Sequence, residues 1–261
     1  MIVPIVKAKA FLGRAKSGRN RPPILQCLAG EDTFEFFVKL RNGKETSKSS
    51  LIFELLGAQL AERFGLKTPD PSIVLITREF CESLMDPQER EVLQKNIGAN
   101  YGSKLLVGYG SSFSNERLTP AERFRAAEVF AFDALLQNPD RTRINPNLLI
   151  RGSDWRLIDH ELAFSFSRDI GVSGWGKDAL PRIMREHIFW GPLRGKEIAL
   201  EKFEVRFHEI TSRGDLNELF AELPRDWIAG DEDVLEKIEN HFKEVRKNFG
   251  EFMELVKRIL Q

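Results

Sequence analysis

The sequence predicts an α+β protein in two lobes: a small N-terminal lobe, built mainly of an antiparallel sheet with one helix, and a mostly helical C-terminal lobe. Strand-like runs and one helix occupy the first hundred residues, a stretch rich in glycine and serine follows at residues 108–112, and helix signals dominate the rest. Strands followed by helices are typical of an α+β fold and not of alternating βαβ units. We therefore expect the lobes at residues 1–108 and 109–261.

The strands of the predicted N-terminal lobe are short. Residues 34–40 combine Phe and Val with bounding turn residues, which indicates a strand. Ile24 and Leu25 lie across the turn at residues 30–32, so the simplest arrangement is a hairpin that runs to Leu40. Two further short strands are expected, at residues 73–76 and 103–107.

Two helices are expected before residue 100. Ser49 or Ser50 can cap a helix that continues to about Phe64 and ends at Gly65, because glycine is common just after a helix C-terminus. A second, strongly charged helix is expected at the surface over residues 86–97.

The C-terminal lobe carries the clearest helix signals. Thr119, Pro120 and Glu122 supply a capping threonine, a proline in the first turn and a reciprocal glutamate, which predicts a helix to about Gln137. Apolar residues recur at spacings of three and four over residues 234–260, which predicts one long amphipathic helix. Core packing and a partner surface both remain open for this apolar stripe.

Composition excludes several classes of protein. Lys and Arg total 39 and so do Asp and Glu, so net charge provides no overall attraction to nucleic acid, which is not expected as a direct substrate. Cys27 and Cys81 fit no metal spacing and are expected as reduced thiols. No apolar run approaches the roughly 18 residues of a membrane span, so a soluble cytoplasmic protein is predicted. The four histidines show no zinc spacing, and no Walker-type phosphate loop is present.

A β-hairpin is expected within the densest group of polar residues, which lies between residues 138 and 160. Residues 148–150 and 155–158 look like two short strands joined by a four-residue turn. Pairing Ile150 with Trp155 sets the register of the whole hairpin. The residues just outside both strands then meet at its open end.

Oxygen-bearing side chains gather at that open end. The register places Asn145 within about a residue of Asp159 across the hairpin, beside the loop that carries Asp140. Two carboxylates and an amide oxygen form a hard-oxygen site suited to Mg²⁺. The alternative is an ordinary turn, because turns favour Asn, Asp and Pro.

Two charged residues lie in otherwise apolar segments of the N-terminal lobe. Lys39 is in the predicted strand, and Glu54 shares a helix face with Leu51 and Leu55. Burying either charge is costly unless it is paired, so each would relieve the other. Alternatively, both side chains reach water from the edge of their apolar face.

The loop at residues 16–22 is basic and rich in small residues. Ser17 and Gly18 can offer backbone donors to phosphates, and Arg19 adds a positive charge. A solvated surface loop has the same composition.

Taken together, these features resemble the HipA-like kinases, a branch of the protein-kinase-like fold related to the phosphoinositide kinases. The resemblance covers about residues 10–200. It is most specific at residues 138–149, Asn-Pro-Asp-Arg-x₃-Asn-Pro-Asn-Leu-Leu, and at residues 157–160, Leu-Ile-Asp-His. Residues 37–39 and 65–69 support it less specifically. The resemblance implies a two-lobed, protein-kinase-like fold.

The resemblance also implies roles in the C-terminal lobe. Asp140 would be the catalytic aspartate that accepts the proton of the acceptor hydroxyl, and Asn145 and Asp159 would hold Mg²⁺ against the phosphates of ATP. The family often has His two residues after the catalytic aspartate, where this chain has Thr142.

In the N-terminal lobe, the resemblance implies that Lys39 binds the ATP phosphates and pairs with Glu54. Ser17, Gly18 and Arg19 would cover the phosphates, although the loop lacks the Gly-x-Gly-x-x-Gly of ordinary protein kinases. Adenine would stack between the lobes and hydrogen-bond to the backbone near Leu106 and Gly108.

The expected function is transfer of the ATP γ-phosphoryl group to a Ser or Thr hydroxyl, on a protein or on the kinase itself. One alternative is an inactive, kinase-shaped module that binds nucleotide or acts with an antitoxin or regulatory protein through its C-terminal helix and basic N-terminus. A third possibility keeps the enzyme and makes a lipid or small alcohol the acceptor.

Overall fold

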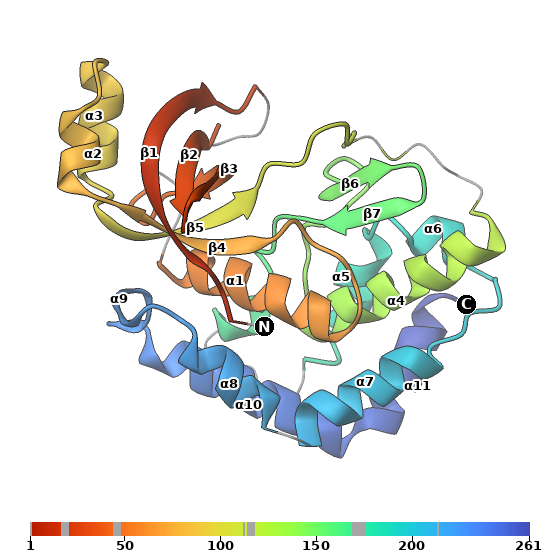
Figure 1. The fold of residues 1–261 in the computed structure, drawn as a ribbon. Helices are drawn as coiled ribbons and strands as arrows, with labels where there is room; N and C mark the ends of the chain where they lie inside the picture. Colours follow the sequence, from red (N-terminus) through yellow and green to blue (C-terminus); the bar gives the residue numbers. More distant parts are fainter. Residues whose placement is uncertain are drawn as a thin grey trace. The chain divides into compact units, whose positions relative to one another are not determined.

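The computed structural model describes residues 2–16, 21–43, 48–111, 113, 118–168, 176–212 and 214–261. The chain divides into two compact units. Figure 1 labels helices and strands along the chain. Unit 1 comprises Met1–Leu55, Pro69–Val107 and Glu222–Asp231, and unit 2 comprises Leu56–Thr68, Gly108–Ala221 and Glu232–Gln261. Each unit draws on three stretches of chain, whereas the predicted lobes are continuous. The lobes stay a prediction.

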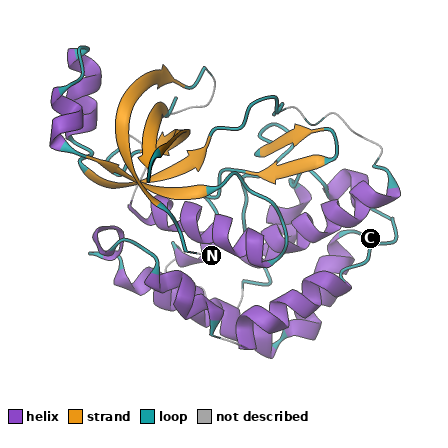
Figure 2. Ribbon diagram, viewed as in Figure 1, coloured by secondary structure: helices purple, strands orange, loops and turns teal. Residues whose placement is uncertain are grey.

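Five strands of unit 1 form a closed barrel in the order β1-β2-β3-β5-β4. Figure 2 draws the strands of the protein in orange. They are β1 (Ile5–Arg14), β2 (Pro23–Ala29), β3 (Asp32–Lys39), β4 (Pro71–Ile76) and β5 (Gly98–Lys104). All neighbours are antiparallel except β1 and β4, which are parallel. The predicted β2–β3 hairpin is confirmed, with Ala29 opposite Asp32 across a turn in which Gly30 has φ +64°.

Alternating side chains fill the barrel core, as the period of a strand requires. Phe36 and Val38 of β3 point inward, as do Leu25 and Cys27 of β2, and all four are buried. Burial raises the pKa of the Cys27 thiol to about 12, so this cysteine is inert at neutral pH.

Two of the strand predictions are corrected. β1 was not predicted, although Val6 and Ala8 alternate with exposed lysines in the period of a strand. The strand expected at residues 103–107 is instead β5, which ends at Lys104 and leaves Val107 79% exposed. β5 is central between β3 and β4, and a Cβ on its Gly102 would lie 2.5 Å from Val74 Cγ2. Packing therefore requires small residues in β5, and these residues weaken the apolar pattern by which a strand is predicted from the sequence.

Unit 1 contains more helix than the single core helix predicted for the N-terminal lobe. Its helical segments are the first half of α1 (Lys48–Arg63), α2 (Arg78–Glu82), α3 (Pro87–Gln94) and α9 (Arg225–Ile228). The helix predicted near residue 50 is confirmed as α1, but Ser49 and Ser50 lie inside it and do not cap it. The predicted surface helix is confirmed as α3, which begins after the N-cap Asp86.

Unit 2 is mostly helical and includes one small two-stranded sheet. Its elements are the second half of α1, α4 (Pro120–Leu136), β6 (Leu148–Arg151), β7 (Asp154–Leu157), the 3₁₀ turn η1 (Ser165–Ser167), α5 (Leu180–Arg185), α6 (Trp190–Leu193), α7 (Glu201–Ser212), α8 (Asp215–Ala221), α10 (Glu232–Lys247) and α11 (Phe249–Ile259). The capping box predicted for α4 is present, with Thr119 and Glu122 bonded reciprocally. The hairpin register is also confirmed, with Ile150 opposite Trp155.

The prediction of a single long C-terminal helix is wrong, because α10 and α11 are separated at Asn248. This residue has φ −114° and ψ 29°, outside the helical region, and its side-chain amide donates to Glu244 O at 2.8 Å. Asparagine disfavours a helix interior because its side chain competes for backbone groups in this way. The apolar stripe nevertheless packs in the core, where Phe249 stacks on Phe207 with ring centroids 4.6 Å apart.

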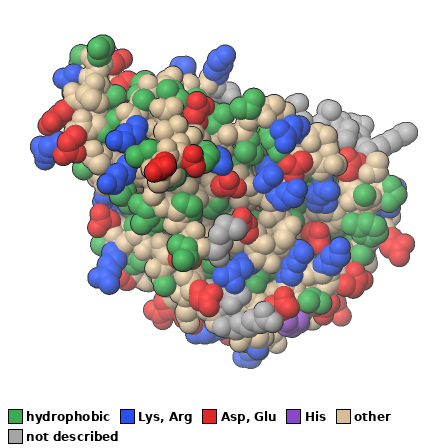
Figure 3. Space-filling model, viewed as in Figure 1, with side chains coloured by type: hydrophobic (Ala, Val, Ile, Leu, Met, Phe, Trp, Pro, Cys, Tyr) green, Lys and Arg blue, Asp and Glu red, His purple; other side chains and the backbone are tan. Residues whose placement is uncertain are grey.

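Charges of both signs are mixed on the surface. On the face drawn in Figure 3, Lys and Arg side chains intermingle with Asp and Glu side chains. This agrees with the equal numbers of basic and acidic residues in the sequence. Among the described residues, no helix has both the length and the apolar character needed to cross a bilayer.

Candidate active site

Asp140 lies in unit 2 on the loop between α4 and β6, and two amide side chains hold its carboxylate. Asn145 Nδ2 donates to Asp140 Oδ2 at 2.9 Å, and Asn147 Nδ2 donates to the same oxygen at 2.8 Å. The backbone N–H of Asp140 is bonded in turn to Asn138 Oδ1 at 3.1 Å. The carboxylate is therefore fixed in direction while remaining partly exposed.

The turn between Asp140 and Asn145 is closed by short-range hydrogen bonds. Thr142 N donates to Asn145 O at 2.9 Å, and Asn145 N donates to Thr142 Oγ1 at 3.1 Å. Thr142 thus stabilises the turn with its hydroxyl, at the position where the related kinases often have His. Because the side-chain nitrogen of Asn145 donates to Asp140, the side-chain oxygen Oδ1 is the atom that Asn145 can offer to a cation.

Arg141 attaches the loop to α4 and is completely buried. Its Nε donates to Asp133 Oδ2 at 2.6 Å, and its Nη1 donates to the backbone carbonyls of Asn147 and, at 3.2 Å, Ile158. These carbonyls belong to opposite sides of the hairpin's open end, where Ile158 N also donates to Asn147 O at 3.1 Å. One guanidinium group therefore joins α4 to both arms of the hairpin.

Asp133 completes a buried charged cluster with Arg141 and His187. Burial alone would raise the pKa of the Asp133 carboxyl, but the charge of Arg141 and the bonds from His187 and Arg141 outweigh it and hold that pKa well below its ordinary value. Asn138 Nδ2 adds a further bond to Asp133 Oδ1 at 3.0 Å. The carboxylate is therefore ionised throughout the neutral range.

The hydrogen bonds of His187 fix its tautomer. Phe189 N donates to His187 Nδ1 at 3.1 Å, so the ring proton is on Nε2, which lies 3.0 Å from Asp133 Oδ2 and donates to it. Burial lowers the pKa of His187 and prevails over the opposing influence of Asp133. A neutral imidazole and a charged guanidinium thus hold one buried carboxylate.

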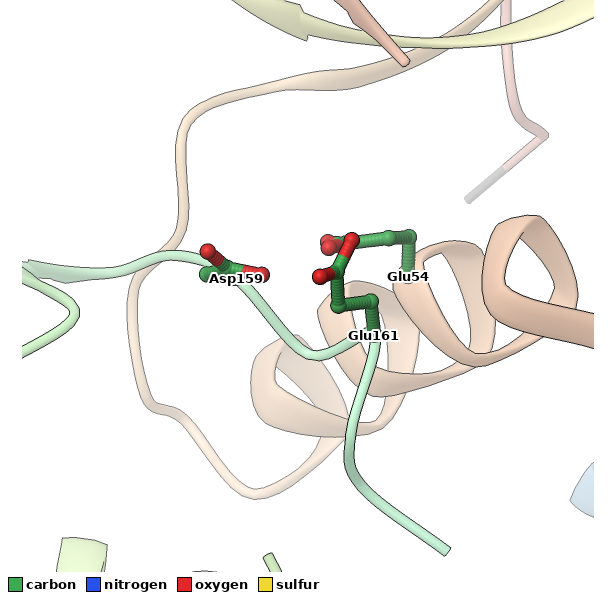
Figure 4. Close-up of side chains that lie close together, drawn as sticks. All are labelled: Glu54, Asp159 and Glu161. Carbon is green, nitrogen blue, oxygen red and sulfur yellow. The ribbon is translucent and has the colours of Figure 1, made fainter. Parts of the chain in front are cut away.

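Asp159 and Glu161 follow β7 on the other side of the hairpin (Figure 4). Asp159 has φ +61°, so the chain leaves the strand direction there. One carboxylate oxygen of Asp159 and one of Glu161 lie within 4.8 Å of each other. Two carboxylates at this spacing are the hard-oxygen donors that Mg²⁺ prefers, so the residues present fit that metal.

Close packing against α1 fixes the backbone between these two acids. His160 is buried, and a Cβ on Gly57 would lie 2.5 Å from His160 Cβ. Only glycine at position 57 allows the helix to approach this closely. The segment of Asp159 is therefore held from the α1 side as well as by the hairpin.

In unit 1, the predicted pairing of Lys39 with Glu54 is present. Lys39 Nζ forms an ion pair with Glu54 Oε1, joining the end of β3 to the first half of α1. The Glu54 side chain is 2% exposed and that of Lys39 is 22% exposed, so the lysine is the partner that reaches solvent. Figure 4 labels Glu54 on its helix.

The remaining predicted residues are those expected to contact adenine and to cover the phosphates. Leu106 follows β5 outside the strand, and Gly108 has φ +81°. Ser17, Gly18 and Arg19 lie outside the described residues. Lys39, Glu54 and Leu106 belong to unit 1, whereas Gly108 and the catalytic and metal-ligand candidates belong to unit 2.

Several residues of this site were not predicted from the sequence. Asp133 is buried inside the apolar run of α4, the same signal that drew attention to Lys39. Glu161 lies two residues after Asp159, a spacing that could have indicated a second carboxylate ligand. His187, 54 residues from Asp133, carries no local signal.

The described part of the site combines an Asp of fixed direction, a loop rich in Asn and Asp, and a hairpin followed by two further acids. The chain matches the HipA-like kinase family over residues 8–254 and therefore belongs to it, which confirms the resemblance. Membership of this family supports a kinase-like phosphotransferase activity for the chain.

Comparison with solved structures gives the proinflammatory kinase CtkA of Helicobacter pylori, with 10% sequence identity and a TM-score of 0.49. The match covers 99% of this chain and 100% of that chain. Comparison with curated proteins gave no match.

Proposed function

We propose that the protein is an ATP- and Mg²⁺-dependent kinase, with a protein-kinase-like fold, that transfers the γ-phosphoryl group to a Ser or Thr hydroxyl of a protein. The observation that carries this proposal is the clamping of the Asp140 carboxylate by the amides of Asn145 and Asn147. Phosphoryl transfer requires little covalent work from the protein and depends on positioning and charge. A carboxylate of fixed direction and partial exposure meets the first requirement.

Each residue has a role in this mechanism. Asp140 orients the acceptor hydroxyl and accepts its proton. Asn145, through its carbonyl oxygen, and Asp159 would hold Mg²⁺, which neutralises charge on the ATP phosphates. Lys39 would bind the same phosphates, and Glu54 would hold the ammonium group in place through the ion pair.

Glu161 is a further candidate ligand for the metal because of its spacing from Asp159. The loop with Ser17, Gly18 and Arg19 would cover the phosphates, and adenine would bond to the backbone near Leu106 and Gly108.

Two substitutions test the roles separately. Asp140→Asn should lower phosphoryl transfer by about 100-fold or more, because the proton acceptor is lost, and should leave ATP binding nearly unchanged. Asp159→Asn should weaken Mg–ATP binding about tenfold or more, because one charged ligand is removed. Asp178→Asn, an exposed change in unit 2, is the control and should match the parent.

Transfer is measured with γ-labelled ATP, and binding by thermal unfolding with and without Mg–ATP. Ligand at 100 times its dissociation constant should add about 2.7 kcal/mol to the unfolding free energy. Normal transfer by both active-site variants would refute the assignment. Binding without transfer in the parent would favour the inactive module.

The position of the label then identifies the acceptor. Label in a protein substrate, or in the kinase itself, supports a protein hydroxyl. Label in a lipid or metabolite fraction alone would instead make the enzyme a lipid or small-molecule kinase.

A further inference from the structure

A second candidate site lies at the end of unit 2 that contains the last turn of α11. An open pocket of about 280 Å³ is lined by Arg185, Trp190, Arg194, Arg258, Ile259 and Gln261. Every charged side chain in this lining is an arginine, and each of the three is exposed. The pocket belongs entirely to unit 2 and contains none of the proposed kinase residues.

The three guanidinium groups lack acidic partners. Across the described ranges, none of Arg185, Arg194 and Arg258 forms an ion pair with a carboxylate. By contrast, Arg14 and Arg156 each bind a carboxylate. Like charges that share one pocket repel each other, and an anion in the pocket would relieve this repulsion.

Hydrogen bonds make the walls of the pocket a defined structure. Trp190 Nε1 donates to Ile259 O at 2.9 Å, and Gly195 N donates to Leu260 O at 2.7 Å. These bonds join α6 to the last turn of α11. The guanidinium carbon of Arg194 lies 5.2 Å from the Trp190 ring centroid, a cation–π contact that orients this arginine.

Helix dipoles account for only part of this charge. Arg185, Arg194 and Arg258 lie at the C-terminal ends of α5, α6 and α11, where a helix attracts cations. α5 and α6 have only six and four residues, so few peptide dipoles align in each helix. The helix ends therefore offset only part of the three positive charges.

We propose that this pocket binds a phosphate group, either as the monoester of a larger molecule or as the free anion. Arginine forks bind phosphate oxygens in bidentate geometry and desolvate more readily than lysine, and the indole provides an apolar wall for the carbon chain that bears the phosphate. The pocket volume of about 280 Å³ accommodates a phosphate group together with part of the chain that bears it. The group belongs either to a phosphorylated Ser or Thr of a protein segment or to free inorganic phosphate.

Isothermal titration calorimetry without ATP tests this site. The probes are inorganic phosphate, a short alanine-rich peptide with one phosphoserine, and the same peptide without phosphate. The parent should bind a phosphate-bearing probe saturably and should not bind the unmodified peptide. The triple variant Arg185→Gln, Arg194→Gln, Arg258→Gln should bind at least about tenfold more weakly, because charge-assisted hydrogen bonds are lost.

Lys257→Gln is the matched control, because Lys257 is exposed on α11 beside Arg258 but does not line the pocket. Thermal unfolding of the triple Arg→Gln variant and of the Lys257→Gln variant checks that they are folded. A triple Arg→Lys variant keeps the positive charges but removes the forked guanidinium groups, so it should bind the phosphate-bearing probe more weakly than the parent. Tighter binding of the phosphopeptide than of phosphate identifies a protein segment as the source, and equal affinity identifies free phosphate. Absence of saturable binding, or equal loss in the Lys257→Gln control, overturns the proposal. No phosphoryl transfer is measured, so this result is independent of the proposed kinase activity.

Discussion

Replacing Arg141 with methionine should destabilise unit 2 by about 3–5 kcal/mol, because an unpaired carboxylate would remain in the core. Methionine has a similar length and no donor. It would lose the bonds from Arg141 to both oxygens of Asp133, at 2.6 and 3.5 Å, and the bond to Ile158 O at 3.2 Å. Asn147 O would keep its bond from Ile158 N, so most of the expected loss comes from Asp133.

The expected loss is large relative to the roughly 5–15 kcal/mol that stabilises an ordinary protein. Urea unfolding at pH 7.5, followed by tryptophan fluorescence, measures the change in unfolding free energy. A loss below about 1 kcal/mol would show that the buried carboxylate does not depend on Arg141, since even one unpaired buried group costs more than that. The charged cluster would then not anchor the catalytic loop.

A double variant separates the ion pair from general damage to packing. Asp133→Leu combined with Arg141→Met removes both charges, so the double variant should lose at least about 2 kcal/mol less than the sum of the two single losses. The double variant should still transfer phosphate more slowly than the parent, because the loop of Asp140 has lost its anchor. Strict additivity of the two losses would refute the direct coupling.

Three further predictions concern stability in unit 2. Gly57→Ala should destabilise the protein by about 1–3 kcal/mol, because the new Cβ would lie 2.5 Å from His160 Cβ. Gly250→Ala should stabilise the protein by up to about 1 kcal/mol, because open space surrounds the new Cβ. Urea midpoints that shift in the same direction for both variants would contradict this prediction. Thr119→Ala should cost about 1 kcal/mol by calorimetry through loss of the capping box, and an unchanged melting temperature would count against it. Burial lowers the pKa of His241 to about 4 in the folded state. The contribution of neutral His241 to the unfolding free energy should therefore be complete above pH 6.5 and should fall by up to about 3 kcal/mol toward pH 4. In urea titrations at several pH values, His241→Gln should reduce this dependence of the unfolding free energy on pH.

The parts of the site that the sequence could predict are those fixed by neighbours in the chain. The register of the β6–β7 hairpin follows from two short apolar runs and one turn, and it sets Asn147 opposite Ile158 as expected. The Lys39–Glu54 pair was predictable because each charge interrupts an apolar pattern. Local periodicity is sufficient in both cases.

The parts that the sequence could not predict depend on contacts between distant segments. His187 reaches Asp133 across 54 residues, and no pattern around His187 records that contact. β5 was misplaced because packing against β3 and β4 selects small residues such as Gly102 over the apolar residues that normally indicate a strand. The break at Asn248 depends on one residue in an otherwise continuous apolar stripe.

Neighbouring residues of the Asp140 loop divide two tasks between them. Asp140 is partly exposed and is held by Asn145 and Asn147, while Arg141 is completely buried and binds Asp133. The backbone between them therefore transmits the position of a buried ion pair directly to the carboxylate proposed to do the chemistry. It follows that substitutions at Asp133 should reduce turnover, because they displace Arg141 and with it the Asp140 carboxylate.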